Sequence, residues 1–195
     1  MADAQTLAVY DVKIDDYLRL TQAPPSKSLL AFIKSIPEGG RVLDLGCGPG
    51  FAAAEMARHG CNVEAIDGSA EMVAAASKHS GVIARQATFD ELPAQATYYG
   101  IYANFSLLHA KRADFNRHIQ ACYAALHSGG IFHLAMKLGT GEKRDALGRF
   151  YTYYTADELK HILTQAGFTP TFEHEGKEKG LAGDVEPFIM MAAHA

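Results

Sequence analysis

The sequence predicts a single doubly wound α/β domain with a mostly parallel sheet and helices on both faces. Short apolar segments alternate with segments of helical periodicity along most of the 195 residues. A glycine-rich turn directly follows the first apolar strand segment, Arg41 to Leu45. The last two apolar segments follow one another with no helix between them, which indicates an antiparallel hairpin at an edge of the sheet.

Turn and capping residues divide the chain into its expected elements. Strands are expected at residues 41–45, 61–66, 82–84, 99–103, 131–136, 168–172 and 185–192. A short N-terminal helix is expected near the edge of the domain. Further helices are expected at residues 29–36, at 51–58, after Ser69, at 115–126 before Gly129-Gly130, and at 155–166. Ser26 and Ser69 are suited to cap the helices that follow them, and Thr155 with Glu158 forms a capping-box signature.

Composition limits the classes of function. The net charge is −4, which disfavours a nucleic-acid partner, because binding to phosphates requires basic surface. Three separated cysteines, Cys47, Cys61 and Cys122, suggest neither a disulfide framework nor a metal site. We expect no signal peptide, no membrane partner and a cytoplasmic location, because no apolar segment is long enough to cross a bilayer.

The residues after the first two strands predict a nucleoside-containing ligand. Gly46 to Gly50 has three glycines in five residues, so the backbone can approach a ligand closely. Asp67 ends the second strand, where a carboxylate can accept the hydroxyls of a ribose. A dinucleotide frame also exists, since Gly48, Gly50 and Ala53 read as G-x-G-x-x-A. That frame begins three residues after Leu45 instead of directly after the strand. Asp44 would also repel a pyrophosphate, whereas it suits a cationic amino group.

The segment Val42 to Gly50, Val-Leu-Asp-Leu-Gly-Cys-Gly-Pro-Gly, resembles the first motif of class I S-adenosylmethionine (SAM)-dependent methyltransferases. Tyr102 to His109 resembles the fourth-strand motif of that family, and Leu126 to Phe132 resembles its turn into the fifth strand. The resemblance extends over nearly the whole chain and is nearest to small bacterial small-molecule methyltransferases. It implies a Rossmann-like seven-stranded sheet, the cofactor SAM with S-adenosylhomocysteine as its product, and a small-molecule substrate.

The resemblance also implies a division of the chain and a set of cofactor contacts. One domain, 1–195, would comprise an N-terminal helical segment (1–38), a SAM-binding core (39–136), a candidate acceptor lid (137–154), and a closing helix with strands (155–195). Asp44 would orient the amino group, the glycines would line the methionine part, and Asp67 would hold the ribose. The full set of expected cofactor-binding residues is Asp44, Gly46, Cys47, Gly48, Gly50, Asp67, Gly68, Met72, Thr88, Phe89 and Asn104.

The segment 137–154 starts at a carboxyl end of the sheet and is long and broken by glycines, as functional loops often are. We expect it to contribute the substrate residues Lys137, Arg144, Arg149 and Tyr151, because arginine suits anionic groups. The alternative is a solvated loop with tyrosines packed at its base. His109 and Tyr151 are the candidate catalytic residues, with His109 as a general base, although a structural role for either remains open.

Three functions remain open at this stage. The first is in-line transfer of a methyl group from SAM to an O, N, S or C nucleophile, which requires alignment of the reactants and no metal. The second is an NAD-dependent oxidoreductase, and the third is a non-catalytic SAM-binding protein. The Asn104-Phe105-Ser106 sequence lacks the Asn-Pro-Pro-aromatic signature of amino-methylating enzymes that act on nucleic acids. The sequence leaves the acceptor and the oligomeric state open.

Overall fold

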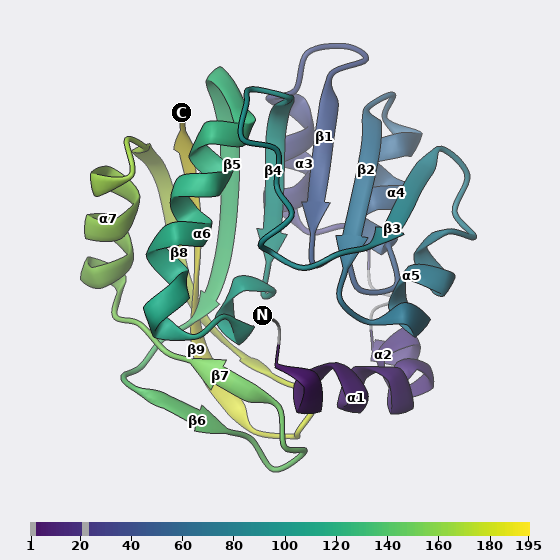
Figure 1. Cartoon of the computed structure of the whole chain (residues 1–195), viewed down its shortest axis with the longest axis vertical. Helices are drawn as coiled ribbons and strands as arrows, with labels where there is room; N and C mark the ends of the chain where they lie inside the picture. The colour runs from purple at the N-terminus through teal and green to yellow at the C-terminus, as the bar shows by residue number, and fades with distance from the viewer. Residues whose placement is uncertain (1–2, 21–23) are drawn as a thin grey trace.

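The computed structural model describes residues 3–20 and 24–195, and Figure 1 shows the resulting α/β arrangement. The helices are α1 (Ala4–Val12), α2 (Ile14–Leu20), α3 (Lys27–Lys34), α4 (Phe51–Arg58), α5 (Ala70–Ala76), η1 (Leu107–His109), α6 (Arg112–Ala125) and α7 (Ala156–Gln165). The strands are β1 (Arg41–Leu45), β2 (Asn62–Asp67), β3 (Val82–Gln86), β4 (Tyr98–Asn104), β5 (Leu126–Lys137), β6 (Glu142–Arg144), β7 (Phe150–Thr152), β8 (Thr169–Lys179) and β9 (Val185–His194).

Seven strands form one sheet in the order β3-β2-β1-β4-β5-β9-β8, and β6 pairs with β7 in a separate hairpin. Strands β1 to β5 pair in parallel, whereas β9 is antiparallel to both β5 and β8. The predicted doubly wound fold is therefore confirmed. The closing hairpin lies at the edge of the sheet as expected, with the antiparallel strand β9 inside it and β8 outermost.

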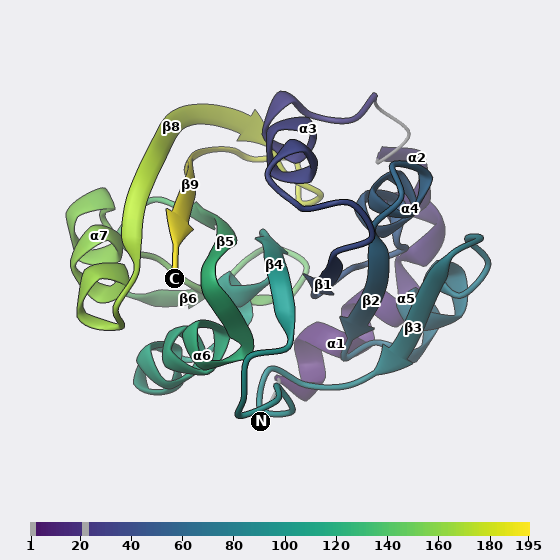
Figure 2. The same cartoon turned by 90° about the horizontal axis from the view of Figure 1, so that it is seen from above.

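Helices cover the two faces of the sheet (Figure 2), with α6 and α7 on one face and α3, α4 and α5 on the other. Alternate side chains of β1 serve the two layers. Leu43 packs in the cluster that contains Phe115 of α6, and Val42 packs in the cluster that contains Phe32 of α3. Successive side chains of a strand point to opposite faces of the sheet, and β1 is buried on both faces. For this reason its sequence is mostly apolar.

The predicted caps of three helices are present. The hydroxyl of Ser26 accepts from the N–H of Leu29, and that of Ser69 accepts from the N–H of Met72. Thr155 and Glu158 form a reciprocal capping box at the start of α7. Each cap satisfies N–H groups that have no partner within the helix, and together they fix where these helices begin.

The N-terminal segment differs from the expectation. It forms two helices, and α1 lies across the carboxyl ends of the parallel strands (Figure 1) instead of at the edge of the domain. The tertiary contacts of α1 decide this position: its helix faces α5, and the N–H of Phe150 in β7 donates to the hydroxyl of Thr6 at 2.8 Å.

Two further segments differ from the expectation. Strand β5 begins at Leu126, directly after α6, so Gly129-Gly130 lies within a strand and does not end the helix. Gly129 has φ +76° and donates to the carbonyl of Ala195, and Gly130 accepts from the N–H of Ala195, so both glycines are held at the end of β9. The segment 137–154 is not an open loop, because β6 and β7 pair within it. Among the described residues, no helix combines the length and apolar character needed to cross a membrane.

Candidate functional site

The turn between β1 and α4 adopts a backbone that favours glycine. Gly46 has φ +74°, and a Cβ atom there would lie 2.3 Å from the Cβ of Ser106. The hydroxyl of Ser106, just after β4, donates to the carbonyl of Leu45 at 2.5 Å. The ends of β1 and β4 are thus drawn together, and a side chain at position 46 would force them apart. Gly48 also has a left-handed φ, +53°, and its N–H faces the end of β2.

Asp67 at the end of β2 is fixed by two backbone donors. One carboxylate oxygen accepts from the N–H of Gly48 and the other from the N–H of Ser69, both at 2.9 Å. Each oxygen retains a further lone pair, because a carboxylate has about four acceptor sites. The carboxylate is thereby oriented to accept two hydroxyls, which is the arrangement that a ribose requires. Burial raises the pKa of Asp67, an effect that its backbone hydrogen bonds oppose.

Asp44 on β1 is a buried carboxylate behind the glycine turn, with 3% of its surface exposed. Its Oδ2 atom has no hydrogen-bond partner among the described residues. Burial raises the pKa of this carboxyl to about 7, although the backbone N–H of Ala53 lowers it. An unsatisfied buried acceptor costs free energy unless a ligand supplies a donor. Asp44 is therefore suited to a cationic ligand group.

A small cavity of about 70 Å³ opens above these residues. Eight of the eleven predicted cofactor residues line it: Gly46, Gly48, Asp67, Gly68, Met72, Thr88, Phe89 and Asn104. Asp44, Cys47 and Gly50 are not among its lining residues, and Asp44 lies two residues before Gly46 on β1. Cys47 is buried with a raised thiol pKa, and a Cβ on Gly50 would lie 2.8 Å from the Cα of Ala76 in α5.

The N-terminal helices contribute cavity residues that the sequence reasoning missed, namely Asp3, Thr6, Leu7, Tyr10 and Tyr17. Leu7 covers Gly68, where an added Cβ would lie 2.8 Å from the Cδ2 of Leu7. The Ser69 hydroxyl donates to Asp11 at 2.5 Å. The sequence contains Tyr10-Asp11 and Asp15-Asp16-Tyr17 in this segment. No local signal, however, indicates that their helices fold over the strand ends.

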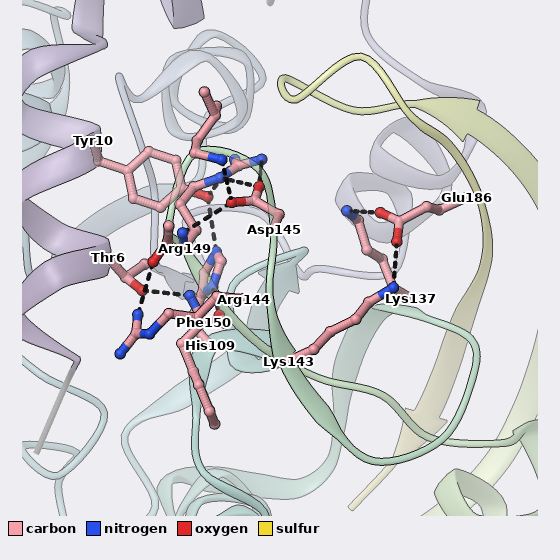
Figure 3. A network of polar contacts seen from close by, with 12 residues as sticks. Thr6, Tyr10, His109, Lys137, Lys143, Arg144, Asp145, Arg149, Phe150 and Glu186 are labelled. Carbon is pink, nitrogen blue, oxygen red and sulfur yellow. Dashed lines mark hydrogen bonds and ion pairs between the residues drawn. The ribbon is translucent and has the colours of Figure 1, made fainter.

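His109 also lines the cavity and belongs to a polar network around α1 and β7 (Figure 3). Its Nε2 atom lies 2.8 Å from the hydroxyl of Tyr10, and its Nδ1 atom lies 2.6 Å from the carbonyl oxygen of Phe150. Burial is the main cause that lowers the pKa of His109 to about 4, so the imidazole is neutral at pH 7. Neutral imidazole is the form that can accept a proton.

The predicted substrate cations lie near this network, but each is paired with an acid. Arg149 is buried against Asp145, and Lys137 pairs with Glu186 (Figure 3). Arg144 pairs with Asp3. Tyr151 is buried, with its ring centroid 4.7 Å from that of His109. None of these four predicted residues lines the cavity. The buried position of Tyr151 matches the alternative interpretation of segment 137–154, in which its tyrosines pack at the base of the segment.

The residues present fit SAM. Asp67 offers two oriented acceptors for a ribose, Met72 and Phe89 offer apolar contact for an adenine, and Asp44 offers an unsatisfied carboxylate for an ammonium group. The glycines at positions 46 and 48 leave the space between these acids free of side chains. In the described part of the chain, no three His, Cys, Asp or Glu side chains cluster in a way that could hold a metal ion.

Comparison with known proteins agrees with this geometry. A family model described as a methyltransferase domain matches residues 17–171. The chain is similar to ubiquinone biosynthesis O-methyltransferases, with 35% identity over 103 residues to that of Chelativorans sp. strain BNC1 (50% of this chain, 40% of the relative). It is 30% identical over 154 residues to that of Dinoroseobacter shibae (68% and 61%). These matches span roughly half of the relatives' length.

The fold is shared with solved methyltransferase structures. A Burkholderia thailandensis 1,6-didemethyltoxoflavin-N1-methyltransferase with bound substrate and S-adenosylhomocysteine superposes with a TM-score of 0.79 at 22% identity. That similarity covers 98% of this chain and 87% of the other. The fold and the glycine-turn site define an α/β protein built to bind a nucleoside. The chain belongs to the methyltransferase-domain family, and its resemblance to class I SAM-dependent methyltransferases is confirmed.

Proposed function

We propose that this protein transfers the methyl group of SAM to the O, N, S or C nucleophile of a small molecule. The observation that carries the proposal is the buried, unsatisfied carboxylate of Asp44 behind a glycine turn that also orients Asp67. A cationic amino group near Asp44 and a ribose on Asp67 are both parts of SAM, whereas a dinucleotide has no ammonium group for Asp44. The printed names of the related O-methyltransferases support methylation of a small organic acceptor.

Each group of cavity residues has a role in this proposal. Asp67 binds the ribose hydroxyls, and Met72, Thr88 and Phe89 surround the adenine. Gly46, Gly48 and Asn104 line the methionine part. Asp44 orients its amino group, directly or through water, and Cys47 and Gly50 support the turn. SAM supplies a methyl group already activated on a sulfonium sulfur. The protein therefore needs only to align the acceptor and exclude water, which α1 does by covering the cavity.

The acceptor side rests on His109, with Tyr151 beside it. His109 presents a neutral imidazole to the cavity and is suited to accept a proton from the acceptor. The ring of Tyr151 packs against the ring of His109. Lys137, Arg144 and Arg149 are each paired with an acid. Each can bind an acceptor only through an N–H group that its ion pair does not use. We retain the proposals of a single domain over 1–195 and of a cytoplasmic location with no nucleic-acid or membrane partner.

Calorimetric titration tests the cofactor assignment. We expect SAM and S-adenosylhomocysteine to bind and NADH not to bind. Asp67→Asn should weaken SAM binding by about 10- to 100-fold, because it loses charge-assisted hydrogen bonds to the ribose. Asp114→Asn, on α6 and outside the cavity, is the matched control and should bind normally.

Two results would contradict the proposal. Tight binding of NADH without SAM would favour the oxidoreductase. Binding of SAM with no methylated product from any acceptor in a broad screen of phenols, amines, thiols and activated carbons would favour a SAM-binding protein without catalysis.

A further inference from the structure

A second cavity, of about 660 Å³, lies on the face of the sheet that α3 covers. Strands β5 and β9 form its floor and α3 forms one wall. The other wall is β8, which curves toward the side of α3 (Figure 2). The volume is within the range of about 300–1,000 Å³ that is typical of small-molecule sites. No described residue lines both this cavity and the one that contains Asp67, so the proposed function gives it no role.

The floor of this cavity is mainly apolar. Alternate residues of β9 face opposite sides of the sheet: Ile189 packs in the cluster that contains Leu159 of α7, whereas Met190 and Ala192 line the cavity. Phe172 of β8 lines it too and exposes 52% of its surface. These side chains face an open space where a helix could have covered them. An apolar molecule that displaces water from this floor is therefore stabilised there by the hydrophobic effect.

His133 on β5 is a polar side chain within this floor, with only 3% of its surface exposed. Its ring stacks on that of Tyr102, with the centroids 4.2 Å apart, which fixes the plane of the imidazole. Its Nε2 atom lies 3.2 Å from Oδ1 of Asn104. A carboxamide oxygen can only accept, so Nε2 carries the ring hydrogen and Nδ1 is bare. Burial lowers the pKa of His133 to about 3, so the ring is neutral at pH 7.

The Nδ1 atom of His133 has no hydrogen-bond partner among the described residues. It is open to the cavity, unlike Nδ1 of His118, which is sealed in the core. A buried acceptor without a donor costs free energy, and a ligand with an O–H or N–H group would recover it. The cavity thus combines an apolar floor with one hydrogen-bond acceptor of fixed orientation.

Charge restricts the chemistry of the donor group. A carboxylate has no hydrogen to donate, and its oxygens would face the lone pair of Nδ1. An ammonium group could donate, but it would lack a counterion. No Asp or Glu of the described chain lines the cavity, whereas Lys27 at the start of α3 does. A neutral hydroxyl can donate to Nδ1 and requires no counterion.

We infer that this cavity is a second ligand site, which binds a neutral apolar alcohol through a hydrogen bond from its hydroxyl to Nδ1 of His133. The hydrocarbon part of the ligand lies on the apolar side chains of β5 and β9. A second copy of this chain fits the cavity less well, because α3 and β8 flank the floor and only a protruding element could reach it. The inference is independent of the proposed function, since the two cavities share no lining residue.

NMR of the methionine methyl groups tests the inference, because each cavity has its own methionine. Met190 lines this cavity and Met72 lines the cofactor cavity. In protein labelled with [methyl-¹³C]methionine, we expect 1-decanol to shift the Met190 signal and S-adenosylhomocysteine to shift the Met72 signal. Methyl nonyl ether is an isomer of 1-decanol that has no hydroxyl hydrogen. It should bind about five- to tenfold more weakly than 1-decanol, as the loss of one neutral hydrogen bond implies.

Two variants separate the hydrogen bond from the apolar contact. His133→Phe removes Nδ1, so 1-decanol and the ether should bind it equally. The matched control is His127→Phe, which lies elsewhere on β5 and outside the cavity and should keep the preference for 1-decanol. Ala192→Phe fills the floor and should abolish the Met190 shift with 1-decanol, whereas S-adenosylhomocysteine should still shift Met72.

Several results would overturn the inference. They are equal binding of 1-decanol and the ether to the unaltered protein, tighter binding of decanoate or decylammonium than of 1-decanol, and no Met190 shift at the solubility limit of 1-decanol. A dimer that Phe172→Asp dissociates in analytical ultracentrifugation would show that a second copy covers this face, which also contradicts it.

A measurement on the unaltered protein covers the case in which the variants do not fold. Long-range ¹H–¹⁵N spectra should show His133 as the Nε2–H tautomer, and 1-decanol should shift its Nδ1 resonance more than the ether does. An Nδ1–H tautomer would show that the ring offers the cavity a donor and would contradict the inference.

Discussion

At the scale of single residues, Asp44 couples the site to the stability of the protein. Its pKa of about 7 in the folded chain lies above the ordinary value of 3.8, because burial disfavours the carboxylate. The folded state therefore binds the proton more tightly than the unfolded state. The free energy of unfolding should fall as the pH rises from about 4 to about 7, by up to about 4 kcal/mol from this group.

Asp44→Asn should remove this contribution. We expect the variant to lose less stability than the unaltered protein between pH 4.5 and pH 7.5 in urea unfolding. His109 and His133 have pKa values lowered by burial to about 4 and about 3, so they favour the folded state as the pH rises toward 6.5. Both histidines are common to the two proteins, and their effect cancels in the comparison. Parallel pH profiles for the two proteins would show that Asp44 is already ionised in the folded state.

At the scale of elements, α1 is held over the cavity at both ends. Near its start, Asp3 accepts two hydrogen bonds from Arg144, at 2.8 and 2.9 Å, and this contact holds the pKa of Asp3 well below its usual range. Near its end, Asp11 accepts from Ser69 after β2. Helix α1 therefore joins the β6–β7 hairpin to the end of β2, and we expect a bound cofactor to leave past it.

Arg144→Ala should loosen the first of these attachments. We expect S-adenosylhomocysteine to dissociate about two- to fivefold faster, a factor typical of one exposed ion pair. Stopped-flow displacement measures this rate without an acceptor. Arg58→Ala removes a comparable exposed ion pair with Glu55 on α4, away from α1, and should leave the rate unchanged. Equal rates for all three proteins would mean that α1 does not limit release.

At the scale of the whole molecule, ligand binding and folding are linked. S-adenosylhomocysteine at 100 times its Kd should stabilise the folded protein by about 2.7 kcal/mol. For a chain of this size, that corresponds to a rise in Tm of about 5–10 °C, measured by differential scanning fluorimetry. Asp67→Asn at the same ligand concentration should show a much smaller rise. A ligand-independent Tm for the unaltered protein would contradict the assignment of the cavity to SAM.

The sequence determined the parallel core and the cofactor side of the site. Turn glycines, cap residues and strand alternation act within a few residues, so β1, α4 and the capped helix starts were predictable. Asp44, the glycine turn and Asp67 could also be recognised from their order and spacing along the chain. These residues meet because parallel strands place their carboxyl ends at one edge of the sheet.

Only the tertiary structure decided what covers this site and which charges remain available in it. The Asp3–Arg144 pair joins residues 141 positions apart, and the Tyr10–His109 contact joins residues 99 apart. No local pattern specifies such partners, since they depend on how α1 packs against the β6–β7 hairpin. For the same reason, the sequence could identify Lys137, Arg144 and Arg149 as cations near the site but could not show that Glu186, Asp3 and Asp145 neutralise them. Sequence periodicity reports on neighbouring residues, whereas the pairing of charged side chains depends on which distant segments meet in the folded molecule.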